Sequence, residues 1–274
     1  MAAITVAFLG DIFGMPGRKV VQQQLPALRD EHQPDVIIAN AENARSGSGL
    51  TPDLYRKIRA YGIDAITMGD HVFRDRSIVE LLQTPSEPIA RPANLSAKAP
   101  GKRWIRLPAN AQRTRDLYVV TVLGRIFMGL PADDPFAAVD DVLAQLPEKN
   151  PLVIVEAHME ATSEKAALAT YLDGRVALVV GTHTHVPTAD ARILPSGTGF
   201  ITDAGMCGPY RSIIGRDVES VLRHMTTGVH VPYGMGAGGE AMCGVVAKLD
   251  EHSGRTLAIQ RVQYDADPAR PPFA

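Results

Sequence analysis

The sequence contains little cysteine and no excess of charge of either sign. Its 274 residues include only two cysteines, Cys207 and Cys243, which form no CxxC pair. This disfavours a thiolate metal site and a disulfide framework, and it favours the reducing cytoplasm, with both thiols as small apolar packing residues. The formal net charge of −2 provides no global basic field. Binding to nucleic acid or to anionic membranes through bulk charge is therefore disfavoured, and only a local basic cleft stays open.

Long hydrophobic runs are also missing. The N-terminus, residues 1–11, has no basic region, and its apolar run ends in an acid, Asp11. This run is too short for a signal peptide or a membrane span, so we interpret it as a buried strand. We expect a soluble protein that is not exported. With 45% hydrophobic and 21% charged residues, the composition is that of an ordinary globular protein.

The chain alternates short β-rich apolar runs with polar or glycine-rich turns and helical stretches. This alternation predicts an α/β fold, and the continuously apolar runs predict strands that are buried on both faces. A further helix is predicted to begin at Thr51-Pro52-Asp53, with an N-cap and a proline at its first position. The other predicted strands are 5–10, 35–39, 63–68, 117–123, 125–128, 152–157 and 176–180, with a tight hairpin at Gly124, and the other predicted helices are 18–31, 76–83, 134–146 and 163–172.

After Thr188 the alternation of strands and helices gives way to short predicted strands separated by turns. Strands are predicted at 192–194, 199–202, 244–249 and 256–262, and together they suggest a second sheet with antiparallel character, hence a layered sandwich. The proline-rich stretch 85–108 resembles a connection or a cap-like insertion over the sheet edge rather than a linker. We therefore predict a single domain over residues 1–274.

Polar side chains that can bind metals follow several of the predicted strands. Ligands gather outside the carboxyl ends of strands in open α/β sheets, so these side chains are expected to converge on one rim. Carboxylate, carboxamide and imidazole ligands without thiolate suit manganese, iron or zinc. The candidates are Asp11, Glu42, Asn43, Asp70, His71, His158, His183 and His185.

These candidates are too many for one tetrahedral ion, and they suggest a two-metal site. One carboxylate can bridge two ions roughly 3.5–4 Å apart, and such a pair clamps a phosphate and activates a water. The nucleophile predicted for neutral pH is a metal-bound hydroxide. A phosphoester is accordingly the expected class of substrate.

Each candidate also has a plainer interpretation. Asp11 can be a helix cap or turn residue, Glu42 and Asn43 can be loop polar groups, and a single histidine such as His158 is more often a core or surface residue. The run Gly181–Val186, with the sequence GTHTHV, is more specific, because alternating histidines in an extended loop point to one side. Chance explains poorly why metal-binding side chains follow several successive predicted strands.

A series of short motifs runs in order through nearly the whole chain, although the segment after about Val218 is less typical. They are GDIFGMPGR at 10–18, ANAEN at 39–43, TMGDH at 67–71, RPAN at 91–94, AHMEATSEK at 157–165, GTHTHV at 181–186 and TDAGM at 202–206. This set resembles the motifs of the YmdB-type metallophosphoesterases. The resemblance implies a calcineurin-like α/β/β/α four-layer sandwich with two metal ions, often iron, and phosphodiesterase activity that includes 2′,3′-cyclic nucleotides.

The resemblance also implies roles for individual residues. Asp11, Asn43 and His185 would hold one metal, with Glu42 as the bridge. His158 and His183, together with the residue at position 70, would hold the second metal.

His71 matches the family's proton donor to the leaving oxygen. That role also suits an imidazole, because its ordinary pKa lies near working pH. The plainer alternative is that His71 only hydrogen-bonds a neighbour.

Two departures from the family pattern concern acids. The family usually has Gly-Asn-His where this chain has Gly69-Asp70-His71. The carboxylate of Asp70 can still coordinate a metal, but it places a negative charge beside the substrate phosphate and can raise the pKa of His71 and alter the choice of metal. Glu156 stands where the family often has aspartate, and we interpret it as an acid behind the ligands or at the surface.

The loop 205–215 is a candidate to lie over the site. It carries Tyr210 and Arg211, and the guanidinium of Arg211 suits a substrate phosphate. An exposed loop arginine without a role is an equally weighted alternative.

The leading hypothesis is a cytoplasmic, binuclear metal-dependent phosphodiesterase that hydrolyses small cyclic nucleotides, with iron as the first candidate metal and manganese or zinc as alternatives. A second hypothesis, motivated by Asp70, is a regulatory protein that binds metal and nucleotide with little turnover. A phosphomonoesterase or an RNA phosphodiesterase on the same scaffold is the third. The sequence leaves open whether the protein forms a homo-oligomer.

Overall fold

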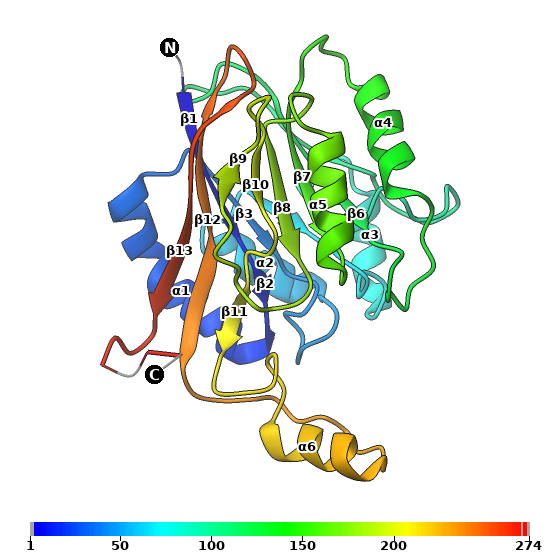
Figure 1. The fold of residues 1–274 in the computed structure, drawn as a ribbon, viewed down its shortest axis with the longest axis vertical. Helices are drawn as coiled ribbons and strands as arrows, with labels where there is room; N and C mark the ends of the chain where they lie inside the picture. Colours follow the sequence, from blue (N-terminus) through cyan, green and yellow to red (C-terminus); the bar gives the residue numbers. More distant parts are fainter. Residues whose placement is uncertain (1–2, 270, 273–274) are drawn as a thin grey trace.

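The computed structural model describes residues 3–269, 271 and 272, and its strands form two sheets that lie between layers of helices (Figure 1). The first sheet has the order β2-β11-β12-β1-β3-β4, with β13 paired to β12. Its strands are β1 (Ala3–Leu9), β2 (Asp11–Ile12), β3 (Val36–Asn40), β4 (Ala65–Thr67), β11 (Met206–Pro209), β12 (Glu240–Asp250) and β13 (Thr256–Asp265).

The second sheet has the order β5-β6-β7-β8-β10-β9. Its inner strands β6, β7, β8 and β10 run parallel, and both edge strands run antiparallel to their neighbours. The strands are β5 (Ile105–Leu107), β6 (Leu117–Leu123), β7 (Leu152–His158), β8 (Leu178–Thr182), β9 (Arg192–Ile193) and β10 (Gly199–Ile201).

The alternation of side chains along the strands produces the layers. In β1, Phe8 faces the core between the two sheets, whereas Leu9 faces the outer core of the first sheet. In β7, Ile154 faces the core between the sheets and Val155 the outer core of the second sheet. Successive residues of a strand point to opposite faces, so both sheets are buried on both sides. The predicted four-layer α/β/β/α sandwich is confirmed.

Helices cover the outer faces of the two sheets (Figure 1), and several begin at capping residues. Thr51 accepts a hydrogen bond from the amide of Leu54 at the start of α2, and Asp134 accepts one from the amide of Phe136 at the start of α4. Each cap satisfies an amide that has no partner inside its helix. The helices are α1 (Gly14–His32), α2 (Pro52–Ala60), α3 (Val79–Gln83, preceded by a 3₁₀ turn at Arg76–Ile78), α4 (Pro135–Gln145), α5 (Thr162–Tyr171) and α6 (Val218–Thr227).

Two predictions about strands were wrong. The four strands expected after Thr188 do not form a sheet of their own, because β9 and β10 join the second sheet whereas β12 pairs with β1 in the first. The expected hairpin at Gly124 is absent, since 125–128 form no strand and Ile126 and Phe127 form a turn. There the amides of Arg125 and Ile126 donate to the buried carboxylate of Glu164, and β6 is already paired to β5 and β7.

The proline-rich stretch 85–108 connects the two sheets. Ile89 bridges to Ile66 of β4, and the stretch ends in the edge strand β5. That the chain forms one domain with a cap here stays a prediction. Helix α6 extends away from the sheets, at the bottom of Figure 1. Within the described residues, no helix combines the length and the apolar character that crossing a membrane requires.

Candidate metal centre

The ends of five strands meet where the two sheets face each other. Asp11 follows β1, Glu42 and Asn43 follow β3, and Asp70 and His71 follow β4, all in the first sheet. From the second sheet, β7 ends at His158, and the loop after β8 carries His183 and His185. The structure therefore brings together all eight residues predicted for the metal site and its proton donor, as the carboxyl ends of parallel strands should.

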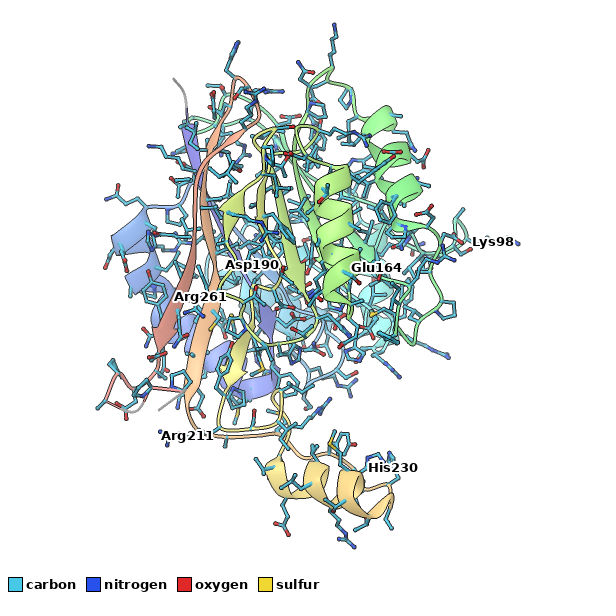
Figure 2. All side chains as sticks on the ribbon, in the orientation of Figure 1. Lys98, Glu164, Asp190, Arg211, His230 and Arg261 are labelled. Carbon is cyan, nitrogen blue, oxygen red and sulfur yellow. The ribbon has the colours of Figure 1, made fainter. Side chains whose placement is uncertain are left out.

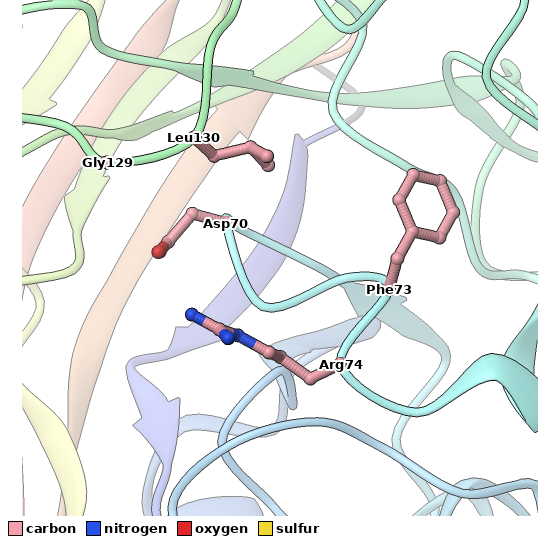
Figure 3. A pocket seen from close by; sticks show the side chains of 5 residues that line it. All are labelled: Asp70, Phe73, Arg74, Gly129 and Leu130. Atoms are coloured by element: carbon pink, nitrogen blue, oxygen red, sulfur yellow. The ribbon is translucent and has the colours of Figure 1, made fainter.

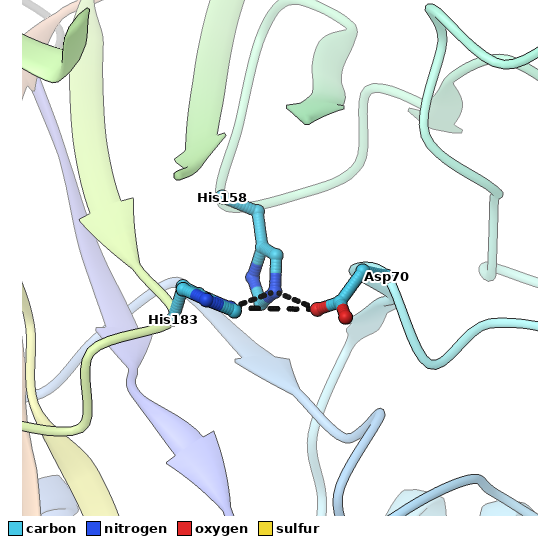
Figure 4. Close-up of side chains that lie close together, drawn as sticks. All are labelled: Asp70, His158 and His183. Carbon is cyan, nitrogen blue, oxygen red and sulfur yellow. Dashed lines mark hydrogen bonds and ion pairs between the residues drawn. The ribbon is translucent and has the colours of Figure 1, made fainter. Parts of the chain in front are cut away.

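One cluster consists of Asp70, His158 and His183 (Figure 4). Oδ1 of Asp70 lies 3.1 Å from Nε2 of His158, which lies 3.1 Å from Nδ1 of His183. The remaining side of this triangle, from Asp70 Oδ1 to His183 Nδ1, measures 3.4 Å. Three electron-pair donors that converge at such distances are suited to surround a cation.

Glu42 occupies the middle of the centre. It belongs to two further groups able to hold a metal, one with Asp11 and His158 and one with Asp70 and His71. Its side chain is buried; Oε1 lies 3.5 Å from Nε2 of His158, and Oε2 accepts a hydrogen bond from the backbone amide of His71. A carboxylate shared between neighbouring groups has the position that a bridging ligand requires.

Asn43 lies between the residues Asp11, Glu42 and His185 on one side and His71 on the other. Its amide nitrogen lies 3.2 Å from Glu42 Oε1, 3.2 Å from His185 Nε2 and 3.4 Å from Asp11 Oδ1. Its oxygen accepts a hydrogen bond of 2.7 Å from Nδ1 of His71. In this arrangement acceptors surround the amide NH₂ group. A cation would be most favoured at the same position.

Two of the three histidines from the second sheet are oriented by acceptors on their outer side. Nδ1 of His185 lies 2.9 Å from the carbonyl oxygen of Ile214, which can only accept, so Nδ1 carries the proton and Nε2 faces the centre with its lone pair. Nε2 of His183 lies 3.4 Å from a carboxylate oxygen of Glu160 and is held as the donor, which leaves Nδ1 directed inward. Outer hydrogen bonds of this kind fix the tautomer of a metal ligand.

His158 is oriented through Thr182 and Glu156. The hydroxyl of Thr182 lies 2.8 Å from Glu156 Oε1 and 2.9 Å from His158 Nδ1. It has one proton and donates it to the carboxylate, so it must accept the proton of Nδ1. Nε2 then faces the centre. Of the two interpretations of Glu156, the surface position is wrong, because this side chain is fully buried and also accepts from Asn40 and Thr121.

The loop that carries His183 and His185 is held in an unusual conformation. Both histidines have positive φ, 93° and 67°, which costs free energy for residues other than glycine. Between them, the amide and hydroxyl of Thr184 donate to Oδ2 of Asp203. Asp203 in turn forms a fully buried ion pair of 2.7 Å with Lys165 of α5. This pair anchors the loop against the second sheet.

The centre requires a glycine at position 69. A Cβ atom there would lie 2.2 Å from Nε2 of His158 and 2.4 Å from Oε2 of Glu42, far inside van der Waals contact. Gly69 therefore lets the chain after β4 approach the cluster closely enough for Asp70 and His71 to join it.

The charges of the centre show how much it favours a cation. Burial raises the pKa of Asp11 to about 7, and the neighbouring carboxylates of Glu42 and Asp203 add to the rise although His158 opposes it. Burial alone would lower the pKa of His158, but the charges of Glu42 and Asp11 and the hydrogen bonds to Asp70 and Glu42 together outweigh burial and raise the pKa well above its usual value. Without a metal, protons on these groups offset the charge of the packed carboxylates.

His71 lies at the rim of the centre. Its Nδ1 contacts Asn43 Oδ1 and lies 3.2 Å from Glu42 Oε1, while Nε2 lies 3.9 Å from Asp70 Oδ2. Burial lowers the pKa of this imidazole, but the hydrogen bond to Glu42 and the charges of Glu42 and Asp70 outweigh burial and leave the pKa raised. The raised pKa favours the imidazolium, the form able to donate a proton from Nε2.

A pocket of about 180 Å³ opens over this rim. Tyr210 and Arg211 do not line it: the hydroxyl of Tyr210 bonds the backbone of Met206, and Arg211 lies beside the lower end of β12 (Figure 2). Arg216 of the same segment lines the pocket instead, where it stacks over Phe13. No sequence signal distinguishes these two arginines, because both lie in one irregular loop.

A family model and two named relatives match nearly the whole chain. The model of a family described as YmdB-like protein matches residues 7–262. The chain is 40% identical to the 2′,3′-cyclic-nucleotide 2′-phosphodiesterase of Bacillus subtilis (strain 168), over 96% of this chain and 97% of that protein. It is 34% identical to a putative phosphatase/phosphodiesterase of Mycoplasma genitalium, over 97% of this chain and 95% of that protein.

Two solved structures resemble the fold over nearly its whole length. A hypothetical protein from Thermus thermophilus superposes with a TM-score of 0.86 at 43% identity, covering 96% of this chain and 99% of the other. A novel phosphatase of Mycoplasma pneumoniae superposes with a TM-score of 0.89 at 31% identity, covering 98% and 96%.

Proposed function

This chain belongs to the YmdB-like protein family, and we propose that it is a binuclear metal-dependent phosphodiesterase that hydrolyses 2′,3′-cyclic nucleotides. The substrate class comes from the name of the Bacillus relative and from the chemistry of the residues at the strand ends. Iron is the first candidate metal, with manganese or zinc as alternatives.

The residues present fit a pair of ions. Nε2 of His158 and Nδ1 of His183 face each other at 3.1 Å, and acceptors behind both rings direct their other protons outward. Two lone pairs at that separation repel unless a proton or a cation lies beside them. This convergence is the observation that carries the proposal.

We assign the ligands to two positions. Asp11, Asn43 and His185 would hold one ion and Asp70, His158 and His183 the other, with Glu42 shared by both. Asn43 would bind through its amide oxygen, the atom that also accepts from His71, because an amide nitrogen has no lone pair to give. When bound, the two ions would offset the charge of the substrate phosphate and lower the pKa of water so that it attacks phosphorus at neutral pH.

His71 would supply the proton to the leaving ribose oxygen. By likeness to the Bacillus relative, that atom is the 2′ oxygen. Transfer of the proton from Nε2 neutralises the alkoxide as the bond to phosphorus breaks, and the imidazole keeps its Nδ1 proton on the oxygen of Asn43. The short contact with Asn43 thus holds the ring in position through the transfer.

A metal analysis combined with a substrate panel tests the proposal. We expect close to two metals per chain, and hydrolysis of 2′,3′-cyclic nucleotides that exceeds hydrolysis of monoesters and short RNA. His71→Asn should keep the bound metal and lose activity, whereas His252→Asn, at an exposed turn, should keep both. A protein that binds two metals but cleaves only monoesters or RNA would contradict the proposed substrate.

The regulatory alternative rests on one observation. The carboxylate of Asp70 lies 3.1 Å from His158 and 3.9 Å from His71, and its charge would repel the substrate phosphate. Hydrolysis by the native protein and by Asp70→Asn separates the two ideas. A large gain in kcat for the variant favours an enzyme weakened by Asp70, whereas fast hydrolysis by the native protein removes the regulatory alternative.

A further inference from the structure

A second pocket lies beside the metal centre on the side of Asp70. It has a volume of about 350 Å³ and is lined by Asp70, Phe73, Arg74, Gly129 and Leu130 (Figure 3). Asp70 belongs both to this pocket and to the cluster with His158 and His183. The pocket over the rim of the centre is smaller, about 180 Å³. The larger pocket shares one residue, Asp70, with the candidate metal cluster.

The two ends of this pocket differ in chemistry. The guanidinium of Arg74 extends toward the side of Asp70, Leu130 lies above Asp70, and the ring of Phe73 lies on the opposite side (Figure 3). Both charged groups thus lie at the end near the metal centre, and the far side is formed by an aromatic ring. Such a gradient suits a ligand whose anionic group faces the metals and whose flat, apolar part faces away.

Arg74 is free to bind a ligand. Its backbone amide donates to the carbonyl oxygen of His71, but its guanidinium forms no hydrogen bond or ion pair with any described residue. The arginine of the smaller pocket differs, because Arg216 donates to the carbonyl oxygens of Ser46 and Gly47. An arginine with uncommitted donors beside a phosphoester site is well placed to contact a phosphate oxygen.

The opposite wall comes from the turn after β6. The amides of Arg125 and Ile126 are fixed by the carboxylate of Glu164 on α5, and the chain continues from there to Gly129 and Leu130, which line the pocket. A Cβ atom on Gly129 would meet nothing within 4 Å, so the wall leaves open space there. The pocket is therefore bounded by one aromatic ring and one aliphatic side chain with room between them.

We propose that this pocket binds the nucleoside of the substrate, with the base against Phe73 and Leu130 and a phosphate oxygen on Arg74. The inference rests on the proposed function and adds the residues that recognise the substrate. A volume of about 350 Å³ lies within the range of roughly 300–1,000 Å³ typical of small-molecule sites. Stacking on an aromatic ring tolerates any base, so the pocket selects nucleotides over other phosphodiesters rather than one base over another.

Two substrates that differ only in the base test the pocket. They are adenosine 2′,3′-cyclic phosphate and methyl ribofuranoside 2′,3′-cyclic phosphate, which keeps the reacting group and has a methoxy group in place of the base. The measured quantity is the ratio of their kcat/KM values. Phe73→Leu, which keeps apolar volume but removes the ring, should lower this ratio by roughly 5- to 150-fold, and Phe73→Tyr should restore it.

Arg74→Ala should raise KM for both substrates and leave their ratio unchanged, because the phosphate is common to both. Arg76→Ala, which removes an exposed arginine two residues further on that lines neither pocket, is the matched control and should change nothing. If Phe73→Leu folds and cleaves both substrates with an unchanged ratio of kcat/KM values, the proposal that this pocket binds the base is wrong. Cleavage of neither substrate by the native protein contradicts the proposed function instead, so the two failures are distinguishable.

Discussion

Two groups of buried acids lie in this molecule, and they differ in what surrounds their oxygens. Glu156, Asp203 and Glu164 accept hydrogen bonds from hydroxyls, amides or a lysine of the protein itself. Asp11 and Glu42 also accept hydrogen bonds from backbone amides, but they face each other and the imidazole of His158. Donors of the fold satisfy the first group, whereas the packed carboxylates of the second favour a proton or a cation between them.

The difference teaches how the centre is built. The acids of the first group hold the side chains that the second group needs: Glu156 orients His158 through Thr182, and Asp203 holds the loop of His183 through Thr184. The structure thus separates a set of residues that would bind metal from a set that positions them. Each of the following experiments tests one side of that separation.

The largest effect is expected at the shared ligand. Glu42→Gln keeps the shape of the side chain but removes the charge that would neutralise both ions. We expect kcat/KM to fall by at least roughly 10³-fold, because electrostatic stabilisation by metal is worth several kcal/mol, and the metal content to fall with it. Glu80→Gln, on the exposed side of α3, is the control. A variant that keeps two metals and full activity would contradict the placement of Glu42.

The buried ion pair should dominate stability. Lys165→Met leaves the charge of Asp203 buried without its partner, and such losses cost roughly 3–5 kcal/mol. Urea unfolding at pH 7 measures the change in the free energy of unfolding. The double variant Lys165→Met with Asp203→Asn removes both charges and should recover part of the loss. Equal destabilisation by the single and double variants would show that the pair is not coupled.

Orientation of His158 should affect metal affinity rather than the fold. In Glu156→Gln, the new amide NH₂ can face Thr182, whose hydroxyl then donates to Nδ1 of His158 and favours the proton on Nε2, the wrong nitrogen for a ligand. Loss of such supporting contacts typically costs roughly 10–100-fold in metal affinity. Titration of the metal-free protein against a chelator of known affinity measures it. Unchanged affinity would leave Glu156 with a purely structural role.

The smallest effect is expected at Asp190 (Figure 2), which also accepts hydrogen bonds from the protein itself but has a partly exposed side chain. Burial alone would raise its pKa, but hydrogen bonds from Thr188 and Thr202 and the contact with Arg192 outweigh it and lower the pKa to about 2. The folded pKa lies below the ordinary value, so this carboxylate stabilises the protein above about pH 4. That contribution disappears as the pH falls toward 2.

Asp190→Asn should therefore cost about 1 kcal/mol at pH 7, a value reduced for solvent screening because a third of the side chain is exposed. The difference from the native protein should vanish near pH 2, and thermal unfolding across this range measures it. A constant difference at all pH values would mean that the charge of Asp190 is not what stabilises this loop.

Much of the fold could be predicted because local patterns decide it. The predicted strands 5–10 and 152–157 correspond to β1 and β7, and Thr51-Pro52 began α2 as its capping pattern indicated. The partners of strands could not be predicted in the same way. Pairing of β12 with β1 joins residues about 240 apart in the chain, and nothing in either strand specifies the other.

The sequence by itself determined the donor atoms of this protein: acids, an amide and histidines at the ends of buried strands, which the topology of an α/β sheet had to bring to one rim. Only the tertiary structure decided which nitrogen of each imidazole faces inward, that Glu156 is buried rather than exposed, and that Arg216 and Arg74 rather than Arg211 line the pockets. The physical reason is distance in the chain. A strand end is a local pattern, whereas a proton's position and a side chain's exposure depend on partners from remote segments.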